Sequence, residues 1–341
     1  MGDVLQSNAK NDLNIAERTN KGNGAVQQIM QLLEELCLGK YYFEAACLLR
    51  NSLLLSSLLS NSESWYDLSE KDIQQLVSID EQLLRKIFSA PRSTPKELLY
   101  LESGSIPIKF ILKSRRLNFL WYMLNEKDDS MLKQFLRAQC ENPVKGDWVT
   151  TVLDDLQELD IKQNFDEISE IPKVTFKNIV NSKVKQKALN FLRNEQQTHS
   201  KSKNLHYSDL KLQDYLMSGL SIIEKSFIFL ARSRMLNVKC NFKVGRTDLI
   251  CSKCGLEDEE QEHLLSCTAL KENSLVSSDY VPKYSDIFSN DSKKLEMIGK
   301  ILMTKFKLLK NDNPLCTDGK SGAATVQCDI DIDVIKPVDK D

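Results

Sequence analysis

The chain has 341 residues, of which 28% are charged and 41% hydrophobic, and its formal net charge is −2. This composition is ordinary for a globular protein, and the length allows two or three domains. No apolar run approaches the roughly 20 residues that a bilayer span requires, and the polar N-terminus lacks an apolar signal core. We therefore expect neither a membrane protein nor a secreted one.

Cysteine usage indicates the compartment. The nine cysteines are an odd number, and Cys37 and Cys47 fall inside helical apolar patterns, where a free cysteine acts as a small core residue. Such usage is typical of a reducing environment. We expect an intracellular protein of the nucleus or cytoplasm.

Helical patterns follow one another along most of the chain, and strand patterns are scarce. Residues 1–25 are rich in Asn, Gly and Lys and are predicted to be a flexible lead-in. Apolar spacing, capping residues and Pro or Gly breaks then predict the successive helices. These lie at about 26–38, 41–59, 70–88, 95–103, 107–125, 130–140, after Asp147, within 173–203, at 222–236 and at 292–309.

The predicted fold class is mainly α, with two helical domains. We expect a helical bundle over 26–160 and a smaller helical domain over 161–310. The second domain would contain a zinc knuckle at about 237–270, and residues 311–341 would form a disordered tail. An acidic block at 147–170 precedes a basic one at 173–203. Such blocks are equally typical of two solvated faces, and that alternative stays open.

Four residues near the C-terminal end have the spacing of a metal site. Cys251, Cys254, His263 and Cys267 form the pattern C-x2-C-x8-H-x3-C. The cysteine pair fits a tight turn, and a helix over 258–267 would put the other two residues on one face. Three thiolates and one imidazole fill a tetrahedral Zn²⁺ shell and leave no position for a catalytic water. The pattern therefore predicts a structural zinc ion.

No pattern of an active site accompanies this cluster. The sequence has no Walker or Rossmann phosphate loop, no G-x-S-x-G elbow and no H-E-x-x-H helix. The pairs Asp128-Asp129 and Asp154-Asp155 lie in helical contexts, without the strand hairpin expected of a polymerase carboxylate pair. We therefore predict that the chain is not an enzyme.

Basic and aromatic residues precede the cysteine cluster. Lysine and arginine neutralise phosphates, and an aromatic ring can stack on an unpaired base. This combination predicts contact with RNA or single-stranded DNA. The predicted residues are Arg232, Arg234, Lys239, Phe242, Lys243 and Arg246. The alternative is a zinc clip for a small subdomain, with the basic residues merely solvated.

Several blocks, taken in order, resemble the C-terminal region of reverse transcriptases encoded by non-long-terminal-repeat retrotransposons. The resemblance covers about residues 18–267. It is carried by Arg18–Gly24, Gly39–Glu44, Leu49–Ser52, Asn61–Tyr66, Ser93–Glu102, Arg115–Leu117, Lys145–Trp148, Arg232–Met235 and the zinc pattern with Gln261–Cys267.

The resemblance implies a thumb-like helical domain that grips primer and template, followed by a zinc knuckle that binds element RNA or target DNA. It also implies nucleic-acid contacts by Arg115 and Arg116, although these two could instead pair with the acidic block. The endonuclease, fingers and palm of the family are absent from the sequence, so polymerase activity is not expected of this chain. A polymerase-bearing protein could then act with it in trans. The alternative is a zinc-stapled intracellular scaffold that binds proteins, which the pI near 6.1 favours.

Overall fold

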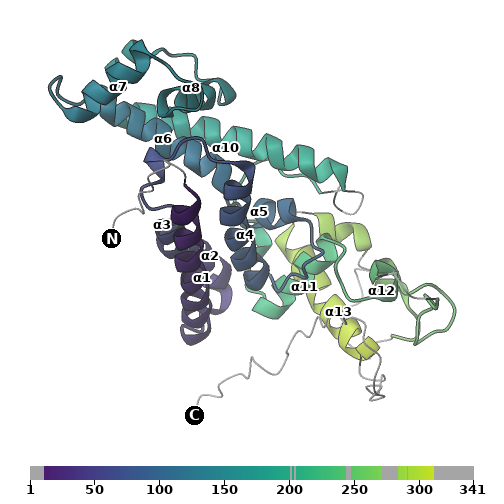
Figure 1. Cartoon of the computed structure of the whole chain (residues 1–341). Helices are drawn as coiled ribbons and strands as arrows, with labels where there is room; N and C mark the ends of the chain where they lie inside the picture. Colours follow the sequence, from purple (N-terminus) through teal and green to yellow (C-terminus); the bar gives the residue numbers. More distant parts are fainter. Residues whose placement is uncertain are drawn as a thin grey trace. The chain divides into compact units, whose positions relative to one another are not determined.

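The computed structural model describes residues 11–199, 202, 205–242, 247–270, 283–289 and 291–310. Over these residues the chain is mainly helical, with two isolated β-bridges and no strand (Figure 1). The predicted fold class is thereby confirmed. None of the described helices is long and apolar enough to cross a bilayer.

The described residues form two compact units. Unit 1 contains 11–87 and 95–222, and unit 2 contains 88–94 and 223–310. The division therefore falls at 222/223, whereas the sequence placed it at 160/161. The reason is that the long helix α10 packs against α5 and α6 of unit 1. The predicted tail over 311–341 lies outside the described residues.

Ten α-helices are described in unit 1, and three are assigned to unit 2. Those of unit 1 are α1 (Asp12–Glu35), α2 (Tyr42–Leu49), α3 (Leu55–Leu58), α4 (Glu70–Ile87), α5 (Lys96–Ser103), α6 (Ile108–Leu124), α7 (Met131–Glu141), α8 (Trp148–Glu158), α9 (Phe165–Glu170) and α10 (Lys173–Thr198). Those of unit 2 are α11 (Ile222–Arg232), which starts at the division, α12 (Gln261–Ser266) and α13 (Ser292–Lys310). Short 3-10 turns lie at Gly39–Tyr41, Ser62–Ser64, Asp214–Met217, Lys239–Phe242 and Tyr284–Phe288, and a π-helical turn lies at Arg50–Leu54.

Helix α1 begins much earlier than the sequence predicted. It starts at Asp12, so the expectation of a flexible lead-in is wrong for residues 12–25. Ile15 is fully buried, and Gly22 lets α1 approach α3 so closely that an added Cβ would lie 2.9 Å from Leu58 Cδ1. Close helix packing, and not a run of large apolar residues, stabilises this part of α1.

Polar residues fix several helix starts as the sequence predicted. The Ser69 hydroxyl accepts a hydrogen bond from the Asp72 N–H at 3.2 Å, while the Asp72 carboxylate accepts from the Ser69 N–H at 3.1 Å. Asp147 accepts from the Thr150 N–H at 2.7 Å and so caps α8. These bonds satisfy N–H groups that a helix leaves without a partner in its first turn.

A buried ion pair lies in the core of unit 1. Arg50 and Asp80 are 2% and 0% exposed, and two bonds of 2.6 and 2.7 Å join the guanidinium to the carboxylate. The Tyr100 hydroxyl donates to the same carboxylate at 3.0 Å, and Arg50 also donates to the carbonyl of Ile106 at 3.0 Å. This cluster joins the π-helical turn, α4, α5 and the segment before α6.

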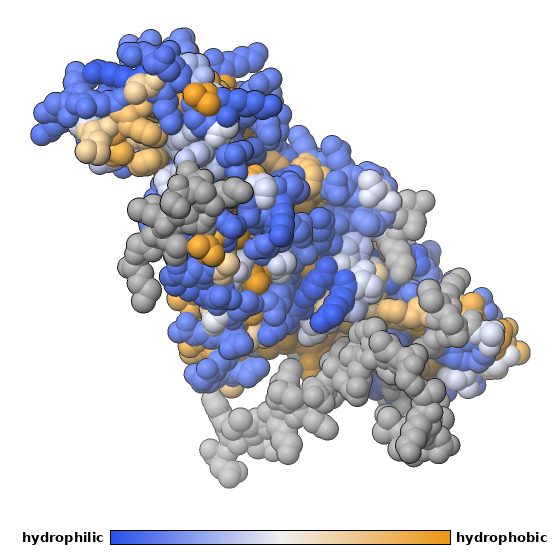
Figure 2. All heavy atoms as spheres, in the orientation of Figure 1, coloured by the Kyte–Doolittle hydropathy of each residue, from blue (hydrophilic) through white to orange (hydrophobic). Residues whose placement is uncertain are grey.

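Helix α7 leaves much of its apolar surface uncovered. Met131, Leu132 and Phe135 are 84%, 37% and 46% exposed, and Leu136 is its one buried residue. Figure 2 shows pale orange side chains gathered over this part of unit 1. An exposed apolar group of this kind is typical of a surface that contacts another molecule.

We expect Asp80→Ala to lower the unfolding free energy of unit 1 by about 3–5 kcal/mol, because it leaves a buried guanidinium without its counter-charge. Tyr100→Phe, which removes one hydrogen bond to the same carboxylate, should cost only about 1 kcal/mol. Urea titration followed by circular dichroism measures both. Equal losses for the two variants would contradict a dominant role of the ion pair.

Candidate metal centre

Helix α11 forms the core of unit 2. Phe227, Ile228 and Phe229 are all buried. Phe229 stacks on Phe88 with ring centroids 4.4 Å apart, and Phe227 meets the ring of Phe306 edge-on at 5.1 Å. The segments 88–94 and α13 therefore both pack on α11, which provides a fixed support for the residues that follow it.

A short hairpin positions the first two cysteines. The Cys251 N–H donates to the Glu257 carbonyl at 2.7 Å, and the Glu259 N–H donates to the Leu249 carbonyl at 2.7 Å. Between them the Gly255 N–H donates to the Cys251 carbonyl at 2.9 Å, and Gly255 has a φ of +65°. A side chain would strain this conformation, so glycine suits the turn that follows Cys254. The turn places the thiols of Cys251 and Cys254 on the same side of the hairpin.

Helix α12 positions the other two candidate ligands. It spans Gln261–Ser266, and the Cys267 N–H donates to the His263 carbonyl at 2.7 Å. One helical turn therefore separates the two side chains, as predicted. The helix is shorter than the predicted range of 258–267, because residues 257 and 259 supply the hairpin bonds.

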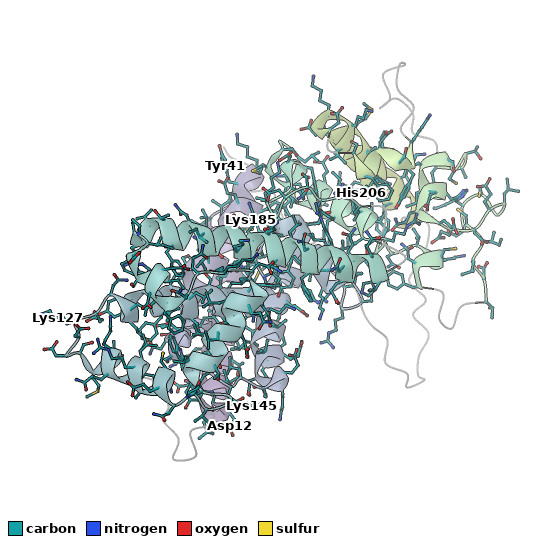
Figure 3. The ribbon with its side chains drawn as sticks, turned by 90° about the horizontal axis from the view of Figure 1, so that it is seen from above. Asp12, Tyr41, Lys127, Lys145, Lys185 and His206 are labelled. Atoms are coloured by element: carbon teal, nitrogen blue, oxygen red, sulfur yellow. The ribbon has the colours of Figure 1, made fainter. Side chains whose placement is uncertain are left out.

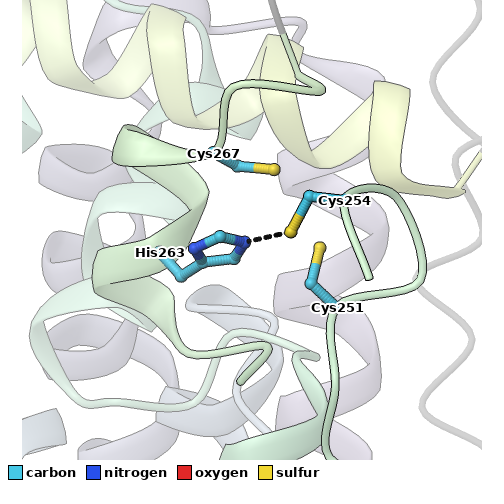
Figure 4. Close-up of side chains that lie close together, drawn as sticks. All are labelled: Cys251, Cys254, His263 and Cys267. Carbon is cyan, nitrogen blue, oxygen red and sulfur yellow. Dashed lines mark hydrogen bonds between the residues drawn. The ribbon is translucent and has the colours of Figure 1, made fainter. Parts of the chain in front are cut away.

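The four side chains converge on one point (Figure 4). One ligand atom from each of Cys251, Cys254, His263 and Cys267 lies within 4.8 Å of all the others. Cys254 Sγ is 3.3 Å from His263 Nε2, and the described cysteines form no disulfide. Four donors at ordinary bond lengths from a tetrahedral ion lie roughly 3.5–3.8 Å apart. The cluster is therefore close to the size that a tetrahedral metal ion requires.

A carboxylate lies behind the histidine. Glu257 Oε2 is 2.8 Å from His263 Nδ1, and His263 is buried while the Glu257 side chain is 69% exposed. A proton on Nδ1 would satisfy this contact and leave the Nε2 lone pair directed at the thiols. Carboxylate–histidine pairs of this kind orient metal-binding imidazoles and fix their tautomer.

The thiols differ in how readily they ionise. Hydrogen bonds from the backbone N–H groups of Leu256 and Glu257 lower the pKa of Cys254 to about 6, against an opposing contribution from desolvation. Burial instead raises the pKa of Cys267. A metal ion binds the thiolate form of cysteine. The lowered pKa of Cys254 makes its thiolate available at neutral pH, whereas the raised pKa of Cys267 means that its thiol needs the positive charge of the ion to lose its proton.

Gln261 is a buried polar residue that the sequence analysis did not single out. It is 1% exposed, and its Nε2 donates to the Ala231 carbonyl at 3.0 Å. Its Oε1 accepts from the Leu236 N–H at 3.1 Å and from Asn241 Nδ2 at 2.7 Å. These bonds tie the start of α12 to the end of α11. A glutamine next to an acidic run carries no local signal of such a role.

The basic residues predicted to contact nucleic acid in unit 2 are mostly engaged within the protein. Arg232 is 2% exposed and donates to the Ile287 carbonyl at 2.7 Å. Arg234 pairs with Glu262 at 2.6 Å, and Lys239 pairs with Asp248 at 2.8 Å. Phe242 is half-buried, while Lys243 and Arg246 lie outside the described residues. The prediction is wrong for Arg232, because its side chain is not at the surface.

In unit 1, Arg116 is also buried. It is 6% exposed, and its guanidinium meets the Asp155 carboxylate at 2.7 and 3.1 Å. Arg115 donates to the carbonyl of Leu59 and, at 3.4 Å, to that of Leu55. The alternative that these arginines pair with the acidic block is thus confirmed for Arg116, and its predicted contact with nucleic acid is wrong.

No protein-family model, no curated protein and no solved structure matches the chain.

We expect Glu257→Gln to weaken metal affinity by about 10- to 100-fold, because an amide holds the imidazole less firmly than a carboxylate does. Chelator competition with Co²⁺ as the probe ion measures the change. Glu260→Gln is the matched control, since this neighbouring carboxylate is exposed and no described residue bonds to its side chain. Equal affinities of the two variants would contradict the role of Glu257.

Proposed function

We propose that the chain is a nucleic-acid-binding protein, for RNA or single-stranded DNA, whose unit 2 is held together by a structural Zn²⁺ ion. Soft thiolates with one imidazole in a tetrahedral arrangement are the ligand set that zinc prefers. Cys251, Cys254, His263 and Cys267 would fill all four positions and leave none for a substrate or an activated water. The centre is thus suited to stabilising structure, which supports a binding protein over an enzyme.

We expect Cys254→Ser to lower both the zinc content and the melting temperature of unit 2, because binding of a structural zinc is coupled to folding. Plasma emission should give about one zinc per wild-type chain. Cys140→Ser is the matched control, since Cys140 is an exposed thiol outside the cluster. Equal zinc content in Cys254→Ser and the wild type would exclude this site.

The surface that we propose to contact nucleic acid is the outward face of α10. The helix has 26 residues and is therefore about 39 Å long. Its inner face is apolar and buried, and Figure 3 shows the helix crossing the near side of unit 1, with Lys185 on it. The outer face carries lysines and amides and no exposed carboxylate. Its exposed polar residues are Lys173, Thr175, Lys177, Asn178, Asn181, Ser182, Gln186, Asn190, Asn194, Gln197 and Thr198.

This face suits a phosphate backbone. Lysines supply charge for phosphates, and the amides between them can donate and accept hydrogen bonds to sugars and bases. Lys185 pairs with Asp209 at 3.0 Å and Lys187 with Asp160 at 2.6 Å, but these pairs are partly exposed. Exposed ion pairs contribute at most about 1 kcal/mol, so a phosphate can replace either carboxylate at little cost.

We expect the combined change Lys177→Gln, Lys183→Gln and Lys185→Gln to weaken binding of single-stranded RNA or DNA by about 10-fold or more. The slope of log affinity against log salt should become shallower by about 2 if all three lysines contact phosphates. Fluorescence anisotropy across a salt series measures both, with duplex DNA as a third ligand. The control exchanges Lys71, Lys127 and Lys145, three exposed lysines elsewhere in unit 1, for glutamine. An unchanged slope would remove α10 from the interface.

The resemblance to the C-terminal region of non-long-terminal-repeat reverse transcriptases supports the same proposal. Under it, unit 1 would correspond to a thumb-like domain and unit 2 to the zinc-knuckle domain, and a polymerase-bearing protein would act with the chain in trans. In unit 2 the cluster of Cys251, Cys254, His263 and Cys267 supports this correspondence, whereas Arg232 and Arg234 are engaged within the protein.

A second candidate is the zinc-stapled scaffold that binds proteins. The exposed side chains of Met131, Leu132 and Phe135 on α7 favour it, since an uncovered apolar face is typical of a protein contact. The anisotropy experiment separates the two candidates. A zinc-loaded protein that binds none of the three nucleic acids at low salt would leave the scaffold as the supported function.

A further inference from the structure

Helix α7 has an apolar stripe on its exposed side. Met131, Phe135 and Ala138 are four and three residues apart, which places them on one face of the helix. All three are exposed, as is Leu132 beside them, and these four residues are the α7 stripe. Pale orange side chains mark this region in Figure 2. The helix packs against α6 and α8 with Leu136 as its one buried residue, so the stripe is left to solvent.

The side chains of the stripe are complementary in size to a second copy of the same stripe. When two copies of α7 lie antiparallel about a two-fold axis, Phe135 of each copy can face the partner subunit's Ala138. A large ring then packs against a small methyl group, which fills space without a clash. The two-fold axis repeats this contact, so both copies use the same surface.

The two ends of α7 carry opposite charge. Residues 127–129, just before the helix, are all exposed, and one lysine with two aspartates gives them a net charge of −1. Residues 137–145, at the end of the helix and after it, are exposed except Gln139, and an arginine, a glutamate and a lysine give +1. An antiparallel pair sets each acidic end against a basic end, whereas a parallel pair would set like charges together. The Arg137–Asp128 pair within one chain is exposed, so it opposes this exchange only weakly.

We propose that the α7 stripe is a self-association surface, on which two copies of this chain pair antiparallel through α7. The stripe has few side chains, so the dimer is a weak one, with a dissociation constant of about 10–100 µM. The proposal goes beyond the proposed function and does not depend on it, because the dimer forms without nucleic acid and α10 is not part of the contact.

The first test is sedimentation equilibrium of the full chain, purified with zinc and free of nucleic acid, between about 1 and 200 µM. We expect a reversible equilibrium between monomer and dimer, with the dimer prevailing at the upper end of this range. A monomer at every concentration would overturn the proposal and leave the stripe to a different protein, as in the scaffold candidate.

Ala138→Lys is the decisive variant. Ala138 is exposed and lies in the last turn of α7, where a lysine suits both the helix and its dipole, so the chain should remain folded. The long charged side chain would occupy the space of the partner subunit's Phe135, and we expect dimerisation to weaken by about 10-fold or more. Leu48→Lys is the matched control, since Leu48 is an exposed apolar residue of α2. A dimer unchanged by Ala138→Lys, or weakened equally by Leu48→Lys, would overturn the proposal.

A charge exchange tests the antiparallel arrangement. Asp128 lies as far before Phe135 as Lys145 lies after Ala138, so the pairing brings Asp128 near the partner subunit's Lys145. Asp128→Lys alone would set two positive charges against each other, and we expect it to weaken the dimer several-fold at low salt. Adding Lys145→Asp to the same chain should restore the affinity. A double variant that dimerises no better than Asp128→Lys alone would overturn the antiparallel pairing.

Discussion

The cost of burying charge determines how this protein uses its basic residues. A guanidinium withdrawn from water destabilises the fold unless it meets a carboxylate or several carbonyls. Arg50 meets Asp80, Arg116 meets Asp155, and Arg232 meets the Ile287 carbonyl. Each contact joins segments that are 30 to 55 residues apart in the chain. These arginines therefore stabilise the units, and they are not available at the surface for a phosphate.

The metal centre depends on a related requirement. Three thiols and an imidazole are brought within 4.8 Å by a hairpin and a one-turn helix, neither of which has much core of its own. An ion that binds the four side chains would hold these two elements together. Gln261 then connects the assembly to α11, whose rings form the core of unit 2. The centre and the apolar core thus support each other.

Local sequence patterns predicted the features that depend on interactions between residues close together in the chain. Helix starts such as Ser69 and Asp147 and the four candidate ligands follow from spacing alone. The acidic block was one of two partners that the sequence left open for Arg116, but the particular carboxylate, Asp155, could not be predicted because it lies 39 residues away. The start of α1 was missed because its buried face includes polar residues such as Asn14 and Arg18, which an apolar pattern does not reveal. The division at 222/223 likewise follows from where α10 packs, which only the folded chain shows.

The sign of the charge around the metal centre decides which unit is better suited to a phosphate backbone. A divalent ion on three thiolates carries a net charge of −1. Glu257, Asp258 and Glu260 add exposed carboxylates to the same hairpin. A phosphate approaching this surface would be repelled. The outward face of α10 has no exposed carboxylate of its own. Under the proposed function, unit 1 is therefore the electrostatically favoured side for nucleic acid, while an ion bound by the cluster would stabilise unit 2.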